Sequence, residues 1–182
     1  MSVLTRLFAL VVATVAVAAV GAAAKAPGSA LEFAVKASYL TKFGPFIHWP
    51  PGAIPDDGPA QICLVGVDPF GAMIDAAAHD QQIDGHPLTV ARMDAVDAKS
   101  AASCQIMFVG KPTAQSTADT LHAAAGLPVL TVTDRSRGVA GGIIEFVISD
   151  GRVRFDIDQG AADADGLQIS AKLLALAVAV RR

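Results

Sequence analysis

The sequence predicts an α/β fold: a three-layer α/β/α sandwich around a mainly parallel sheet, with an antiparallel hairpin at the C-terminal edge. Three observations lead to this class. Residues 62–67 and 106–110 are continuous apolar runs, which are typical of strands covered on both faces. A helical pattern follows each run, and right-handed crossovers of this kind make neighbouring strands parallel. Ser149-Asp150-Gly151 separates two further strand-like segments and is a strong hairpin signal.

The first predicted element is an amphipathic helix over residues 31–47. Pro45 kinks or ends it, and Pro50-Pro51-Gly52 stops the pattern before a loop over residues 52–59. Apolar residues recur along the helix at spacings close to three and four, as expected of one buried face. They are Leu31, Val35, Tyr39, Leu40, Phe43 and Ile47.

Two strand–helix units come next. In the first, the strand over residues 62–67 leads to Asp68 as N-cap and Pro69 as first helical residue, and the helix continues to about His79. Residues 86–93 form the following strand.

In the second unit, the strand over residues 106–110 precedes a helix over residues 113–125. Gly126 ends that helix, and residues 128–133 form the next strand.

The C-terminal part departs from this alternation. Residues 142–148 and 152–158 form the hairpin, and apolar residues alternate with charged ones in its second strand. This strand therefore has one wet face and lies near the sheet edge. Residues 167–180 are predicted as a closing helix that offers apolar side chains to the core: Ile169, Leu173, Leu174, Leu176 and Val180.

The N-terminus has the layout of a secretory signal peptide. A positively charged start is followed by a 14-residue apolar stretch over residues 7–20 and by Ala22-Ala23-Ala24. Cleavage after Ala24 is preferred to cleavage after Ala26, which would place Pro27 just beyond the cut bond. An uncleaved anchor is the alternative. The expected organisation is a signal peptide over residues 1–24, a linker over 25–30 and one domain over 31–182, located in the periplasm.

Charge and composition exclude some partners. The formal net charge is −3 and becomes −4 when Arg6 leaves with the signal peptide. A mildly acidic chain without a cluster of Lys and Arg is a poor binder of nucleic acid. It also lacks the basic patch that would hold it on anionic lipid, so no direct membrane insertion is expected after cleavage.

Cys63 and Cys104 are the two cysteines. An even pair in an exported protein indicates a disulfide, and two buried reduced thiols are the alternative. If Gly66 and Gly110 end adjacent parallel strands, the unequal offsets put the two side chains on opposite sheet faces. A bond therefore requires Cys104 to lie in the turn before its strand.

No pattern for catalysis or metal binding is present. The four histidines lack the spacing of a helical metal pair, and a G-x-S-x-G nucleophile motif is absent. We therefore expect no metal, no cofactor and no enzymatic activity. The turn from Gly66 to Gly71 lacks a G-x-G-x-x-G pattern, and Asp68 places a carboxylate where a phosphate would bind, so a structural cap is favoured over an anion site.

Phe46, Trp49 and Pro50 form the most suggestive partner-binding candidate. They include the only tryptophan, beside rigid prolines at the end of a predicted helix. Aromatic anchors are common at interface centres. A helix end that packs into its own core explains the same residues, and both interpretations stay open. The Gly138–Gly142 loop carries three glycines and either gates a contact or only turns the chain.

Seven motifs in order resemble the YfiR (HmsC-type) family of bacterial periplasmic proteins, over about residues 31–180. They are Val35-Lys36-Ala37-x-Tyr39-Leu40 with Trp49-Pro50, Ile62-Cys63-x-x-Gly66-x-Asp68-Pro69, Cys104-x-Ile106-x-Phe108-Val109-Gly110, Pro128-Val129-Leu130-Thr131-Val132-x-Asp134, Gly142-x-Ile144-x-Phe146, Asp150-Gly151-Arg152-Val153-Arg154-Phe155 and Gly166-Leu167-x-Ile169-Ser170-x-Lys172-Leu173-Leu174.

The resemblance implies a non-enzymatic regulator that represses a membrane-bound diguanylate cyclase by binding its periplasmic sensor domain, which lowers cyclic di-GMP and biofilm formation. It implies dimers, and a disulfide at Cys63 and Cys104. A second cysteine pair, which some members carry, is missing here, so a two-bridge redox switch does not transfer. The alternatives are a periplasmic small-molecule binder, with its ligand near Gly66 and Gly110, and an accessory protein of a sensor kinase. A thiol oxidoreductase is disfavoured because C-x-x-C is absent.

Overall fold

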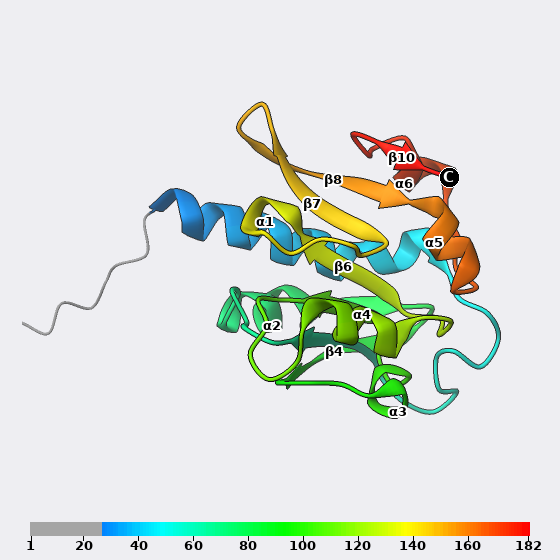
Figure 1. Cartoon of the computed structure of the whole chain (residues 1–182). Coiled ribbons are helices and arrows are strands. Elements are labelled where there is room, and N and C mark those ends of the chain that lie inside the picture. The colour runs from blue at the N-terminus through cyan, green and yellow to red at the C-terminus, as the bar shows by residue number, and fades with distance from the viewer. Residues whose placement is uncertain (1–26) are drawn as a thin grey trace, which may run out of the picture.

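The computed structural model describes residues 27–182 as a three-layer α/β/α sandwich, which confirms the predicted fold class (Figure 1). The proposed signal peptide and both cleavage points lie outside the described residues. The main sheet has eight strands in the order β10-β8-β7-β6-β5-β2-β4-β3. Helix α1 runs behind this sheet and α4 in front of it. No helix within residues 27–182 has the length and apolar character needed to cross a membrane.

Helix α1 spans Pro27–Phe43 and so begins before the expected start at residue 31. Residues 27–30 form its first turn. The helix ends as predicted near Pro45, which lies in the 3₁₀ turn η1 (Gly44–Phe46). Strand β1 (Ile47–His48) follows and pairs antiparallel with β9 (Gln168–Ile169) in a separate small sheet.

The parallel part of the sheet contains the strands predicted along the chain. Its strands are β2 (Ala60–Val65), β4 (His86–Met93), β5 (Ile106–Val109), β6 (Leu130–Asp134) and β7 (Ile144–Ser149). Pairing is parallel throughout this set. The short β3 (Gln82–Ile83) pairs antiparallel with β4 and forms one edge.

The helices divide between the two faces of the sheet. Helix α1 and α2 (Ala72–Ala78) cover one face, where Ile62, Phe108 and Phe146 lie in the larger core cluster. Helices α3 (Ala98–Ala101) and α4 (Thr117–Ala124) cover the other face over β2 and β5, where Val65 and Met107 are buried. Alternate residues of the central strands therefore enter different cores, which explains their unbroken apolar runs.

The start of α2 differs from the prediction. Asp68 is not its N-cap, because the helix begins at Ala72 with Gly71 as the capping residue. The Asp68 carboxylate instead accepts the backbone N–H groups of Phe70 at 2.7 Å and of Gly71 at 3.1 Å. Asp68 therefore has the capping role expected of it, but it caps the turn that precedes α2 and not the helix itself.

The hairpin is as predicted. Strand β8 (Arg152–Asp158) pairs antiparallel with β7, and the turn residues Asp150 and Gly151 have φ values of +50° and +69°. Positive φ at both central positions is the geometry of a type I′ turn. The hairpin tip extends beyond the body of the sheet (Figure 1).

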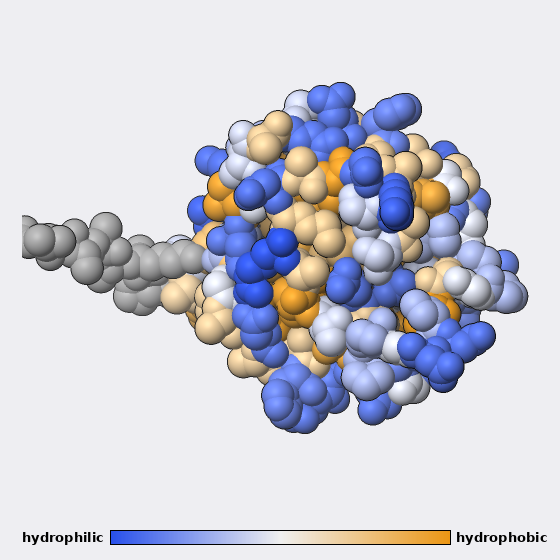
Figure 2. Space-filling view, turned by 90° about the horizontal axis from the view of Figure 1, so that it is seen from below, coloured by the Kyte–Doolittle hydropathy of each residue, from blue (hydrophilic) through white to orange (hydrophobic). Residues whose placement is uncertain are grey.

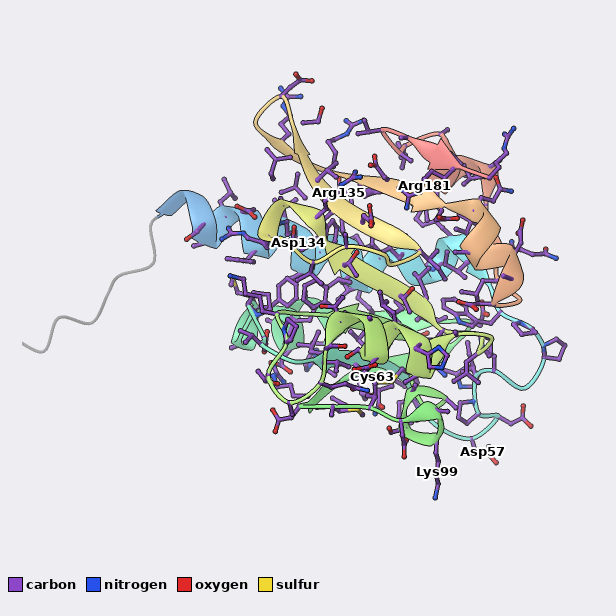
Figure 3. The ribbon with its side chains drawn as sticks, in the orientation of Figure 1. Asp57, Cys63, Lys99, Asp134, Arg135 and Arg181 are labelled. Atoms are coloured by element: carbon purple, nitrogen blue, oxygen red, sulfur yellow. A yellow bond between two sulfur atoms is a disulfide. The ribbon has the colours of Figure 1, made fainter. Side chains whose placement is uncertain are left out.

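The expected wet face of β8 is wrong at Asp156, which is buried at 6% exposure. Arg135 forms an ion pair with Asp156 and lies 3.3 Å from Glu145 of β7. Arg181 reaches Glu145 at 3.6 Å and Asp158 at 3.2 Å (Figure 3). Arg135, from the 3₁₀ turn η2 (Arg135–Arg137), and Arg181 therefore pair with the carboxylates on this part of the sheet.

The predicted closing helix over residues 167–180 is wrong. This stretch contains β9, the short helix α6 (Ala171–Leu174) and the edge strand β10 (Val180–Arg181), after α5 (Gln159–Ala164). Ser170 caps α6, and β10 pairs with β8. Because the chain leaves helical geometry, Leu176 and Val180 are 54% and 37% exposed instead of entering the core, whereas Leu173 is buried.

Candidate functional site

The carboxyl ends of β2 and β5 form the switch point of the sheet, because the chain leaves them toward opposite faces. Ligands of open α/β sheets bind in a crevice at such a point. Here the two loops contact each other directly: Val67 N–H donates to the Lys111 carbonyl at 3.0 Å, and Gly110 N–H donates to the Val65 carbonyl at 2.8 Å. A Cβ on Gly110 would collide with the Val67 carbonyl. The crevice itself is therefore filled by backbone.

A pocket of about 190 Å³ lies beside this closed crevice, toward β6. Gly110, near which a small-molecule site was expected, lines this pocket, whereas Gly66 does not. Most of the lining is apolar, and the polar groups come from three residues. Its lining residues are Phe33, Val67, Pro69, Phe108, Val109, Gly110, Lys111, Asp134, Arg137 and Val139.

One wall of this pocket is backed by a buried ion pair. The Lys36 ammonium, with a fully buried side chain, lies 2.5 Å from Asp134 Oδ2, 2.6 Å from Glu32 Oε1 and 3.1 Å from Ser136 Oγ. All three donors of the ammonium therefore have partners. Asp134 also accepts the Ser136 hydroxyl at 2.5 Å.

Glu32 joins the buried pair to the surface. Its carboxylate binds Lys36 and also Arg137, whose Nη2 lies 2.9 Å from Glu32 Oε2. Burial alone would raise the pKa of Glu32, but the hydrogen bonds from Lys36 and Arg137 outweigh it and hold the pKa below its usual value. The carboxylate is therefore ionised in the folded protein at neutral pH.

Sequence reasoning did not find this network, although one signal was present. Lys36 lies three residues after Phe33 and four before Leu40, on the buried face of α1. A cation on an apolar stripe requires a buried carboxylate partner. Which carboxylate it meets depends on tertiary structure, because Asp134 is 98 residues away in sequence.

The disulfide is present, which confirms the expected pair. Cys63 and Cys104 are bonded, with Cα atoms 5.7 Å apart, a normal separation for a bridge. Cys63 of β2 is opposite Met107 in register, and Cys104 precedes β5, in the turn after α3. This is the placement that the strand offsets require. Both cysteines are buried, at 0% and 1% exposure.

The candidate residues Phe46, Trp49 and Pro50 are half-buried. Phe46 and Trp49 pack against the larger core cluster. Trp49 also has a buried indole N–H that makes no hydrogen bond within residues 27–182. The packing is what a helix end docked into its own core requires, and an interface role for the three residues remains a proposal.

A more exposed surface surrounds the hairpin. We define the hairpin surface by Leu31, Ile148, Arg152, Arg154 and Val178. Leu31 is 69% exposed, Ile148 46% and Val178 50%. Two open grooves of about 380 and 330 Å³ lie on the two faces of the hairpin: Leu31 and Ile148 line the first, Arg154 and Val178 line the second, and Arg152 lines both. On the face seen from below, hydrophilic and apolar residues are interleaved (Figure 2).

Residues 27–182 contain no group of three or more His, Cys, Asp or Glu side chains placed to hold a metal ion. The carboxylates of the Arg135–Arg181 network are paired with arginines. Fold and site together define the class of protein: a three-layer α/β domain with one internal disulfide. A network of charged residues lies on its sheet, and open grooves lie beside its hairpin.

The comparison with protein families identifies the chain within this class. A model of the YfiR/HmsC-like family matches residues 33–178, so the chain belongs to that family. A comparison with curated proteins gave no match. At the level of the family, membership supports a periplasmic regulator of a diguanylate cyclase.

Proposed function

We propose that this protein is an exported, non-enzymatic regulator that represses a membrane-bound diguanylate cyclase by binding its periplasmic sensor domain. Repression lowers cyclic di-GMP and with it biofilm formation. The observation that carries the proposal is the family match, which extends over residues 33–178. The signal peptide over residues 1–24 delivers the chain to the periplasm, where the mature domain stays soluble.

The proposed mechanism requires a difference in affinity. A repressor shifts the equilibrium of its partner toward the inactive state only if it binds that state more tightly than the active state. Each tenfold change in the ratio of the two states requires about 1.4 kcal/mol of differential binding free energy. Contacts of the regulator must therefore form in one state of the sensor domain and be lost in the other.

The hairpin surface is the preferred contact region. Val178 supplies exposed apolar area beside Arg152 and Arg154, with which it lines one groove, and these arginines supply positive charge; Ile148 lines the other groove, on the opposite face of the hairpin. No ion pair within the described residues occupies either arginine. An apolar centre flanked by arginine is a common composition of protein interfaces. A partner surface with an apolar patch and carboxylates fits this region. The segment of Phe46, Trp49 and Pro50 is the competing candidate.

Two sets of variants distinguish these surfaces. Purified protein is added to spheroplasts that expose the periplasmic face of the cyclase, and cyclic di-GMP is measured. Val178→Asp and Arg154→Glu are expected to weaken repression at least tenfold at unchanged circular dichroism, whereas Lys99→Ala, far from the hairpin in Figure 3, leaves it unchanged.

Loss of repression by Phe46→Ala and Trp49→Ala alone, with the hairpin variants fully active, would move the interface to the aromatic segment. No effect of the wild-type protein on cyclic di-GMP would contradict the cyclase as target and favour a sensor kinase or another partner. A homodimer is compatible with either surface, and sedimentation of the variants tests whether one of them also disrupts self-association.

A further inference from the structure

The pocket beside the closed switch point has walls suited to an apolar ligand body. Phe108 of β5 is 2% exposed and Phe33 of α1 is 5% exposed, so both aromatic rings are fixed by the core. Val67, 49% exposed, lies at the mouth with Pro69. A concave apolar lining with a few polar groups is the usual form of a small-molecule site.

Two cations belong to the same pocket. The Lys111 ammonium is exposed and has no ion pair among the residues that the structure describes. The Arg137 guanidinium is held by Glu32 and lies 4.8 Å from the centroid of the Phe33 ring. Arg137 is therefore positioned before any ligand arrives, which lowers the entropic cost of binding.

The charges around the pocket leave one positive charge uncompensated. Its surroundings contain three cations, Lys36, Lys111 and Arg137, against two carboxylates, Glu32 and Asp134. Asp134 lines the pocket but already accepts from Lys36 and Ser136, so its charge is neutralised in place. Among the described residues, Lys111 is the cation of this group without an ion-pair partner.

We propose that this pocket binds a small organic monoanion, with its carboxylate at Lys111 and Arg137 and its apolar body against Phe33 and Phe108. The volume of about 190 Å³ suits a small organic acid. Inorganic phosphate would leave the aromatic walls unused.

The test is an NMR titration of the mature chain with benzoate, and with benzamide as the neutral analogue of the same shape. Benzoate is expected to shift the amide signals of the lining residues saturably in the millimolar range, and benzamide to bind at least tenfold more weakly. Lys111→Ala is expected to weaken benzoate binding at least tenfold, and Lys99→Ala to leave it unchanged. Both lysines are exposed, so these substitutions leave the fold intact.

A second variant separates the pocket from surface charge. Val67→Trp closes the mouth while keeping every charge, and is expected to abolish the benzoate shifts. Equal affinity for benzoate and benzamide would refute anion recognition. Shifts confined to Arg152 and Arg154, or no shift up to tens of millimolar, would refute the site. None of these outcomes depends on the cyclase, so the pocket and the proposed regulation fail or survive separately.

Discussion

Replacing Lys36 by Met is expected to destabilise the domain strongly. The substitution retains an apolar side chain of similar length but removes the cation that pairs with Asp134 at 2.5 Å. Asp134 is buried, and only Ser136 would still donate to its carboxylate. Removing one partner of a buried ion pair costs about 3–5 kcal/mol, because the other charge stays buried without compensation. The loss of the Lys36–Glu32 ion pair adds less to this cost, because the Glu32 side chain is 20% exposed.

Urea denaturation with a fluorescence readout measures this cost. A loss of about 4 kcal/mol corresponds to a fall in melting temperature of roughly 10 °C for a domain of this size. The matched control is Lys42→Met on the exposed side of the same helix, which is expected to change stability by less than about 0.5 kcal/mol. Adding Asp134→Leu to Lys36→Met is expected to restore most of the loss, because it removes the stranded charge.

The double-mutant cycle decides whether the pair acts as described. A coupling free energy above about 2 kcal/mol between Lys36 and Asp134 is the expected result for groups in direct contact. A loss of under about 1 kcal/mol in Lys36→Met, or additive effects in the double variant, would show that the pair does not hold α1 to the end of β6.

Two further predictions concern the bridge and one acid. The double variant Cys63→Ala, Cys104→Ala opens a loop with a sequence separation of 41 and is expected to lose about 4 kcal/mol by chain entropy, measured in urea; unchanged unfolding would contradict a stabilising bridge. Burial raises the pKa of Asp165, against the opposing effect of its hydrogen bond from Gly126 N–H. The folded state then binds more protons than the unfolded state between the ordinary and the raised pKa, so the contribution of Asp165 to stability falls as pH rises through that window. Asp165→Asn, which keeps an acceptor for Gly126, is expected to remove this pH dependence, and an unaltered stability–pH curve would refute it.

Local patterns determine the elements that the sequence predicted well. The strand at residues 86–93 matches β4 at both ends, and the Asp150-Gly151 turn has the two positive φ angles that its residues favour. The offset between Cys63 and Cys104 placed the second cysteine in the turn before β5. For the strand and the turn, a short stretch of chain contains the whole determinant.

Long-range contacts determine what the sequence did not predict. Residues 167–180 have a helical apolar pattern, but pairing of β9 with β1 and of β10 with β8 takes precedence over it. Asp156 was expected in solvent because apolar and charged residues alternate in its strand. The arginine that pairs with it is 21 residues away, so the local pattern does not reveal it. The crevice between the ends of β2 and β5 is closed because the loops after Gly66 and Gly110 bond to each other, a contact that neither loop reveals alone.

Cyclic di-GMP in living cells tests the central claim most directly. The gene is deleted and then restored as the full chain, or as a chain without residues 1–24 that stays in the cytoplasm. Deletion is expected to raise cyclic di-GMP, the full chain to lower it again, and the chain without its leader to have no effect although it is made at equal level. Unchanged cyclic di-GMP on deletion, or full restoration by the leaderless chain, would contradict repression from the periplasm.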